Sequence, residues 1–563
     1  MNIISIKYFI RRHWPVPVVF FVVVHLLYFK TRQAGFVTDF TGLQQRLDGA
    51  PLRDFLHSFG FPAMHQVTNF FLFIFYKIFG TGAWGWYGVY TLLHIANGFL
   101  GYILAKKIFE KEGLKATIVF RHHTVCVPAL MAAGLFLVLP YNAEPVVWRV
   151  CFNFLFCTFT MLSSLLFLVK YLERGKKSSL VYSLLFFIVA LFTFELALAL
   201  PLMSAVFIWW WKEDKIKWEK ILIIPGIHLL FVAFYFFLNK TMLGAWVGHY
   251  GADVHFNFDV RQIASNGLKY FFKNLLYWRE WPHGDKESFL RFLDTSVAAY
   301  AFLSAGFVVI FYFILFYKKI KPSGRTAIFA WLLFFLALSP LLNLYVVWVL
   351  HGENDRYGYF ASLFFYIGLV GLLQYFNKKI KYSIYGLLFL ASVFYLNQIN
   401  IYWKNSADIV RRLLATFQWE DCSEIYVLAF PDNYRGIPMF KDFSKKDLAL
   451  KSALEYLAGK KTKGRFYQIA QFNMIGPDDG FIVEGRPGGV VNMQFNDWGH
   501  WWWRNGIGTG SYETEWYVFK TISKGCEIKI KKAAPDAVFI YSDGGRWKET
   551  PQRFFNISRF SDK

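Results

Sequence analysis

The stretch SVAAYAFLSAGFVVIFYFILFY, residues 296–317, carries no charged side chain. A helix of about 20 apolar residues crosses the hydrocarbon core of a bilayer, so this stretch predicts a transmembrane helix. Similar runs recur near 14–30, 86–108, 124–140, 146–170, 179–195, 196–211, 219–239, 326–348, 358–376 and 382–402. The sequence therefore predicts a polytopic α-helical membrane protein with about 11 transmembrane helices.

The amino-acid composition changes near residue 405. The whole chain is 56% hydrophobic, above the about 45–50% of soluble domains. The tail has mixed polarity and short apolar runs separated by turn residues, which favours strands at 425–430, 465–472, 480–483, 489–495, 515–522, 527–530 and 537–541, with one helix at 446–458. We predict a transmembrane domain over 1–404 and a soluble β-rich α+β domain over 405–563.

The positions of the basic residues argue against nucleic acid as a partner, although the net charge is +23. Lysines and arginines cluster in short loops between apolar runs, as expected of cytoplasmic loops. A further apolar run, 63–79, is interpreted as a helix flat on the outer surface, because every other loop then obeys the positive-inside rule. The N-terminus is then cytoplasmic, and the loops 31–85 and 240–295 and the domain 405–563 lie outside.

Three acidic residues near the predicted outer face are candidates for function, since a charge beside a membrane span is costly. Asp39 follows the first span, and Glu144 lies in the turn PYNAEP, residues 140–145. Glu195 stands at the junction of two apolar runs. A helix cap, a turn role and a structural ion pair are the respective alternatives.

Arg356 is the basic residue of the outer segment HGENDRYGY, residues 351–359. A guanidinium at the mouth of a membrane cavity suits a phosphate, because its planar fork makes two parallel hydrogen bonds. An internal ion pair with Asp355 or Glu353 is the alternative.

The chain resembles the GT-C-fold glycosyltransferases, and within them the branch of the tetratricopeptide-bearing transmembrane O-mannosyltransferases and their bacterial relatives. The segment DRYGYFAS, 355–362, is similar to the family's Glu-Arg-Tyr-Leu-Tyr-Leu-Pro-Ser signature. Further similar segments are Ser339-Pro340 with Asn343, NAEPVVW at 142–148, His94 with Asn97, FVTD at 36–39, and the run 63–79. The sequence departs from the family at Phe40, His65 and Thr193-Phe194-Glu195, and it lacks the repeats.

The resemblance implies an inverting transferase that moves a sugar from a polyprenyl-phosphate donor to a hydroxyl of a protein, glycan or lipid. Phosphate leaves without protonation, so the enzyme needs a base opposite the leaving group and cations beside it. Asp39 is then the base, and Arg356, His65 and His94 contact the donor phosphate. Supporting positions, or ligands of a divalent Mg²⁺ or Mn²⁺, are Glu144, Asp355, Glu195, Glu353, Asn97, Asn343 and Tyr357.

The tail contains NDWGHWWWR, residues 496–504. Trp501, Trp502 and Trp503 can stack on sugar rings, anchor the domain at a membrane interface, or fill a β core. Other functions that stay open are an oligosaccharide ligase or polymerase, a lipid-linked sugar transporter and a non-catalytic glycan-binding member. The family's bacterial branch and the absence of a cleaved signal or retention tail predict a bacterial inner membrane, with the tail in the periplasm.

Overall fold

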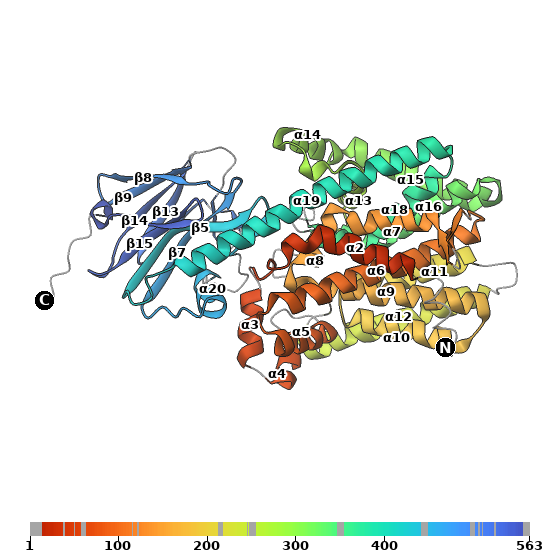
Figure 1. The fold of residues 1–563 in the computed structure, drawn as a ribbon, viewed down its shortest axis with the longest axis horizontal. Helices are drawn as coiled ribbons and strands as arrows, with labels where there is room; N and C mark the ends of the chain where they lie inside the picture. Colours follow the sequence, from red (N-terminus) through yellow and green to blue (C-terminus); the bar gives the residue numbers. More distant parts are fainter. Residues whose placement is uncertain are drawn as a thin grey trace.

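The computed structural model describes residues 14–37, 40–49, 51–57, 64–114, 116–120, 123–211, 218–244, 246, 255–345, 354–440, 449–495, 502–504, 507–508, 510–522 and 525–555. It is a bundle of long helices with a β-rich C-terminal region at one end (Figure 1). The predicted fold class, a helical membrane protein with a β-rich tail, is confirmed at this level.

Seven helical stretches within the described residues are long and apolar enough to cross a membrane. They are Ala83–Lys111, Arg149–Arg174, Leu222–Leu243, Ser296–Lys319, Pro322–Leu342, Asp355–Leu373 and Lys378–Thr416. The pair Val127–Val138 and Pro140–Val147, bent by 59°, makes an eighth if it counts as one span. The other predicted spans correspond to shorter apolar helices, Pro15–Thr31, Lys177–Leu191 and Glu195–Trp211, so the number 11 stays a prediction.

Small side chains allow the helices of the bundle to approach closely. In α6 (Ala83–Lys111), a Cβ at Gly98 would lie 2.6 Å from the side chain of Leu137 in α7 (Val127–Val138). A Cβ at Gly101 would lie 2.8 Å from Leu363 in α18 (Tyr359–Leu373). Such close packing by small residues is typical of helix association in lipid, where the hydrophobic effect contributes little.

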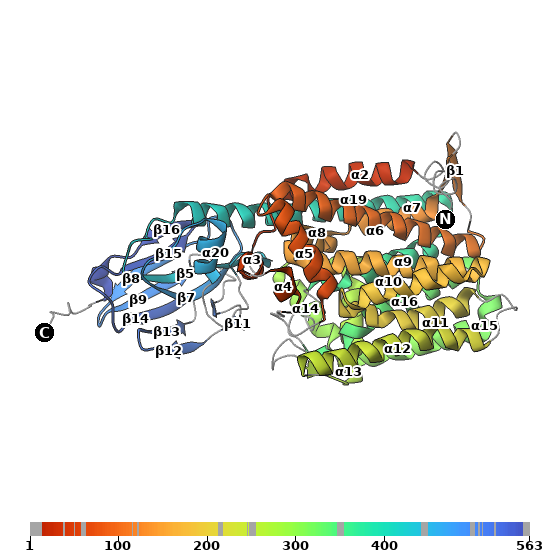
Figure 2. The same cartoon turned by 90° about the horizontal axis from the view of Figure 1, so that it is seen from below.

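Ion pairs join three of the predicted cytoplasmic loops at the end of the bundle away from the β-rich region. Lys107 binds Glu173 at the end of α9 (Phe152–Arg174), with a shortest N–O distance of 2.7 Å. Glu112 accepts from Tyr317 at 2.9 Å and pairs with Arg325 at 2.7 Å. The hairpin of β1 (Thr117–Phe120) and β2 (His123–Cys126) lies at the same end (Figure 2).

The C-terminal region is built from two sheets. In the first, β5 (Glu424–Tyr434) pairs in parallel with β7 (Arg465–Met474) and β15 (Val538–Asp543), and every residue of β5 is buried. The other strands of this sheet are β6 (Ile437–Pro438), β10 (Trp502–Arg504), β11 (Ile507–Gly508) and β16 (Arg546–Glu549). The second sheet is antiparallel, in the order β12 (Ser511–Glu513), β13 (Tyr517–Ile522), β14 (Gly525–Ile530), β9 (Val490–Phe495) and β8 (Phe481–Arg486).

One continuous helix joins the bundle to the β-rich region. Helix α19 runs from Lys378 to Thr416 and passes through residue 404, the predicted domain boundary (Figure 1). Near its end it binds the first sheet, because Trp547 of β16 donates to the Leu413 carbonyl at 2.7 Å. A second junction forms where α20 (Ala449–Leu457) packs on α3 (Phe40–Gly49), with Gln44 donating to the Tyr456 carbonyl at 3.0 Å.

Short helical elements occupy the end of the bundle that faces the β-rich region. They include α5 (Gln66–Phe79), α8 (Ala143–Val147), α13 (Val260–Leu276), α14 (His283–Leu293) and the 3₁₀ turns η2 (Pro140–Asn142), η3 (Arg149–Cys151), η4 (Glu195–Ala199), η5 (Trp278–Glu280) and η7 (Asp355–Gly358). The remaining helices are α2 (Pro15–Tyr28), α4 (Leu52–His57), α10 (Lys177–Leu191), α11 (Leu200–Trp211), α12 (Trp218–Leu243), α15 (Ser296–Phe316) and α16 (Pro322–Leu342).

Candidate functional site

The candidate site lies where helix α7 breaks and where helix α18 begins. Pro140 lies at the break between α7 and α8. A proline at this position removes a backbone donor and bends the helix axis. Glu144 follows this break in α8, while Arg356 and Tyr357 form η7 at the start of α18. Breaks of this kind place polar backbone groups and charged side chains at the end of the bundle that faces the β-rich region, outside the apolar interior of the bundle.

Glu144 and Arg356 form the central ion pair of the site. The Arg356 guanidinium donates through Nη1 to Glu144 Oε1 at 2.5 Å, and the Arg356 backbone N–H donates to Glu144 Oε2 at 2.8 Å. Each side chain keeps some exposure, 18% for Arg356 and 15% for Glu144. A guanidinium has five N–H donors. Pairing with Glu144 therefore fixes Arg356 without using all of its capacity to bind an anion.

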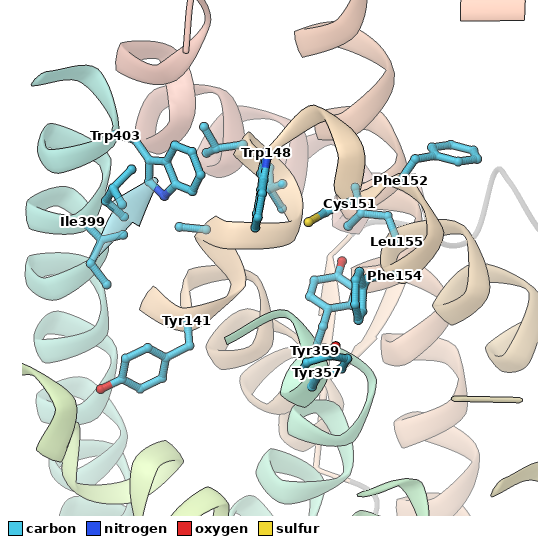
Figure 3. Packing of buried hydrophobic residues seen from close by; sticks show 14 of the residues in the cluster. Tyr141, Trp148, Cys151, Phe152, Phe154, Leu155, Tyr357, Tyr359, Ile399 and Trp403 are labelled. Carbon is cyan, nitrogen blue, oxygen red and sulfur yellow. The ribbon is translucent and has the colours of Figure 1, made fainter. Parts of the chain in front are cut away.

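Aromatic rings surround the Arg356 guanidinium. Its Cζ lies 5.1 Å from the ring centre of Trp148, 5.9 Å from Phe154 and 5.1 Å from Tyr357. Figure 3 shows these three rings gathered beside the turn between α8 and α9, with Trp403 of α19 on its other side. Rings at this distance attract the cation and exclude water, which strengthens an electrostatic contact with a bound anion.

His65 and Glu195 form a second pair that contacts the aromatic wall. His65 Nε2 lies 2.8 Å from Glu195 Oε2, and Tyr235 of α12 donates to Glu195 Oε1 at 3.4 Å. The Phe194 ring lies 5.5 Å from the His65 ring and stacks on Tyr357 at 6.4 Å. The described hydrogen-bond partners of the Glu195 carboxylate are thus His65 and Tyr235.

Asp355 binds two cations from a different part of the chain. Lys273 of α13 places its Nζ 2.6 Å from Asp355 Oδ1, and Arg279 of η5 pairs with Asp355 Oδ2. The partner considered for Arg356 was Asp355 or Glu353, whereas the described contact is with Glu144. Asp355 instead ties η7 to the 260–280 segment.

His94, Asn97 and Asn343 lie apart from the Arg356 contacts. His94 is fully buried, with Nδ1 2.7 Å from the Tyr359 hydroxyl and Nε2 3.1 Å from the Leu137 carbonyl. Asn97 is fully buried and donates to the Leu155 carbonyl at 2.9 Å. Asn343 ends α16, and its carbonyl accepts from Asn257 at 2.7 Å. Both ring nitrogens of His94 are therefore hydrogen-bonded within the bundle, and neither is offered to a phosphate.

Several predicted site residues lie outside the described part of the chain, namely Asp39, Glu353 and Trp501. Trp502 and Trp503 belong to β10, where they pair with Phe472 and Gln471 of β7. The segment before Asp39 is held tightly. A Cβ at Gly35, where φ is +97°, would clash with the Val147 carbonyl oxygen, and Arg149 donates to the Ala34 carbonyl at 3.2 Å.

The carboxylates of the described residues do not fit a divalent ion. No three His, Cys, Asp or Glu side chains among the residues that the structure describes come close enough together to hold a metal. Glu144 and Asp355 are each bound to cationic side chains, and Glu195 to His65. A metal ion would have to displace these partners, so the reaction proposed below uses no metal ion.

Comparison with known proteins finds few that are similar to this chain. No protein-family model matches it, and no curated protein sequence matches it. Among solved structures, the crystal structure of ArnT from Cupriavidus metallidurans bound to undecaprenyl phosphate is similar over 81% of this chain and 92% of that chain, at 12% identity and a TM-score of 0.37.

Proposed function

We propose that this protein is an integral-membrane glycosyltransferase that moves a sugar from a polyprenyl-phosphate donor to an acceptor hydroxyl. The observation that supports this is Arg356, a partly exposed cation at a helix break, fixed by Glu144 and walled by aromatic rings. A site of this kind suits a phosphate that is attached to a membrane lipid, because its charge is met by the guanidinium while its chain stays among apolar helices.

In the proposed reaction the acceptor oxygen attacks the anomeric carbon of the sugar. The bond from this carbon to the phosphate oxygen breaks, and the polyprenyl phosphate leaves with the electron pair. Arg356 stabilises the negative charge that develops on the leaving phosphate. Asp39, which lies outside the described residues, takes the proton of the acceptor hydroxyl, as the family resemblance implies. Attack opposite the leaving group inverts the anomeric configuration.

The extracytoplasmic side of a bacterial inner membrane is the proposed location, with the β-rich region in the periplasm. Support comes from the distribution of basic loops. Three of them are joined by ion pairs at the end of the bundle opposite Arg356. The acceptor, whether protein, glycan or lipid, would enter between Arg356 and the β-rich region. Trp501, Trp502 and Trp503 remain candidates for contacting its sugar rings.

The test is donor turnover by full-length protein in lipid nanodiscs. Wild type, Arg356→Gln, Asp39→Asn and Arg261→Gln are offered undecaprenyl-phosphate-linked radiolabelled sugars with a crude periplasmic acceptor extract. Arg261 is the matched control, since it is an exposed arginine that pairs only loosely with Asp259, at 3.8 Å. We expect label to leave the lipid with wild type and Arg261→Gln alone. Equal turnover by Asp39→Asn contradicts the base assignment, and no turnover by wild type contradicts the transferase.

A further inference from the structure

Asp355 is a buried carboxylate that the proposed reaction does not use. Its side chain is 7% exposed and is held by Lys273 and Arg279. The Lys273 ammonium is 3% exposed and lies 4.9 Å from the Tyr141 ring centre and 5.3 Å from that of Tyr270. A carboxylate buried between two cations is fixed strongly, because removal of a partner leaves a charge without compensation.

Arg279 also contacts the β-rich region, at the turn between β5 and β6. A Cβ added at Gly436 would come into van der Waals contact with Arg279 Nη2, at 3.5 Å, so this turn lies beside the guanidinium with room for about one carbon atom between them. Arg435 and Gly436 adopt φ values of +49° and +79°, and the Gly436 N–H donates to Asn433 Oδ1 at 2.9 Å. The left-handed conformation suits glycine and brings the turn close to Arg279.

The same turn is attached to α19 and to β7. Arg435 donates through Nη1 to the Tyr402 hydroxyl at 3.2 Å and through Nε to the Ile475 carbonyl at 2.6 Å. Its guanidinium lies 5.0 Å from the ring centre of Tyr402. The turn is therefore fixed on both sides of the point where it meets Arg279.

Asp355 and Arg356 are joined by one peptide, so a shift of either residue constrains the other. Consecutive Cα atoms are about 3.8 Å apart across a rigid trans peptide. The Arg356 N–H of that peptide is held by Glu144, and the carbonyl of the preceding residue, Asn354, accepts from Tyr270 at 3.2 Å. A displacement of the Asp355 side chain therefore moves the peptide that carries the Arg356 guanidinium.

We propose that Arg279 is a positioning residue through which the β-rich region controls anion binding at Arg356. The turn at Arg435 and Gly436 lies beside Arg279, Arg279 binds Asp355, and Asp355 shares a peptide with Arg356. The proposal rests on the proposed function, in which Arg356 binds the phosphate of a polyprenyl carrier. It assigns to the β-rich region a role in donor binding, in addition to any contact with the acceptor.

The experiment measures the dissociation constant of undecaprenyl phosphate for full-length protein in nanodiscs. We compare wild type with Arg279→Gln, Arg279→Lys, Arg435→Gln and the control Arg261→Gln. We expect Arg279→Gln to weaken binding about tenfold. Arg279→Lys should recover part of this loss, because it keeps the charge but not the planar fork. Arg435→Gln should weaken binding less than Arg279→Gln does, and Arg261→Gln should leave it unchanged.

A second series separates positioning from a general structural effect. In an Arg356→Gln background, Arg279→Gln should weaken binding no further, because Arg279 acts through Arg356. An effect of Arg279→Gln that persists in this background overturns the proposal, as does unchanged binding by Arg279→Gln when Arg356→Gln binds weakly. Binding by wild type that Arg356→Gln leaves unaltered overturns the proposed function instead. Absence of binding by wild type overturns both.

Discussion

Glu144→Gln should destabilise the fold and strengthen phosphate binding. The carboxylate accepts two hydrogen bonds from Arg356, at 2.5 and 2.8 Å. Glutamine keeps an acceptor oxygen for the Arg356 N–H but loses the negative charge. A hydrogen bond to a charged group contributes about 1.5–3 kcal/mol, so we expect a loss of that size in the free energy of unfolding.

The effect on phosphate binding has the opposite sign, because the Glu144 carboxylate repels a phosphate that binds the free edge of the same guanidinium. A phosphate on the free edge of Arg356 would lie roughly 6–7 Å from the carboxylate, where two unit charges repel by about 2.5 kcal/mol at an effective dielectric constant of about 20. The pair is 15–18% exposed, so solvent screening reduces this to about 1 kcal/mol. Undecaprenyl phosphate should therefore bind about fivefold more tightly to Glu144→Gln.

Two measurements on the same nanodisc preparation test this prediction. Thermal unfolding gives the stability change, and a titration with undecaprenyl phosphate gives the dissociation constant. Repeating the titration in high salt should reduce the difference between the variants, since screening weakens the repulsion. Weaker phosphate binding by Glu144→Gln than by wild type refutes the proposed repulsion between Glu144 and the phosphate. Glu144 would then be a residue that only orients Arg356.

Three further predictions concern other parts of the molecule. His228→Leu should raise the free energy of unfolding by about 1–2 kcal/mol. The reason is that His228 is fully buried in α12 and neither of its ring nitrogens has a hydrogen-bond partner among the described residues. A lower melting temperature contradicts it. Burial raises the pKa of the Glu280 carboxyl above its usual range, despite the opposing charges of Arg279 and Lys273. The ionised form is thus disfavoured in the fold, and its cost appears as the pH rises from the usual glutamate range through the raised pKa. Glu280→Gln should therefore stabilise the protein at neutral pH but not at acidic pH, and equal melting shifts at both pH values contradict this. Sugar transfer should be unchanged by EDTA, because cationic side chains already bind Glu144 and Asp355. A loss of rate that Mg²⁺ or Mn²⁺ restores contradicts this.

The sequence predicted the elements whose signal is local. Charge-free apolar runs predicted the long helices, and alternating runs predicted strands that have counterparts in β5, β7, β8, β9, β13, β14 and β15. The short strands β6, β10, β11, β12 and β16 were missed, because two to four residues carry too little alternation to be recognised. Where the apolar run is shorter, as in α10 and α11, length alone did not determine whether the helix crosses the membrane.

The candidate site could be predicted as a set of residues on one side of the membrane, but not as a set of partners. Arg356 and Glu144 are 212 residues apart, and the sequence contains no signal that pairs them in preference to Asp355 or Glu353. Lys273 and Arg279 were missed for the same reason, since they are two cations within a long polar loop. His94 matched a family motif, yet its position on the inner face of α6 buries it completely.

The continuity of α19 fixes how the β-rich region stands on the bundle. Its 39 residues at a rise of about 1.5 Å span roughly 58 Å, and within them no proline occurs at which the helix would kink. The strands of the β-rich region are therefore carried by a stiff rod and do not swing on a flexible tether. The turn at Arg435, which binds Tyr402 of the same helix, is thus presented to the bundle in one orientation.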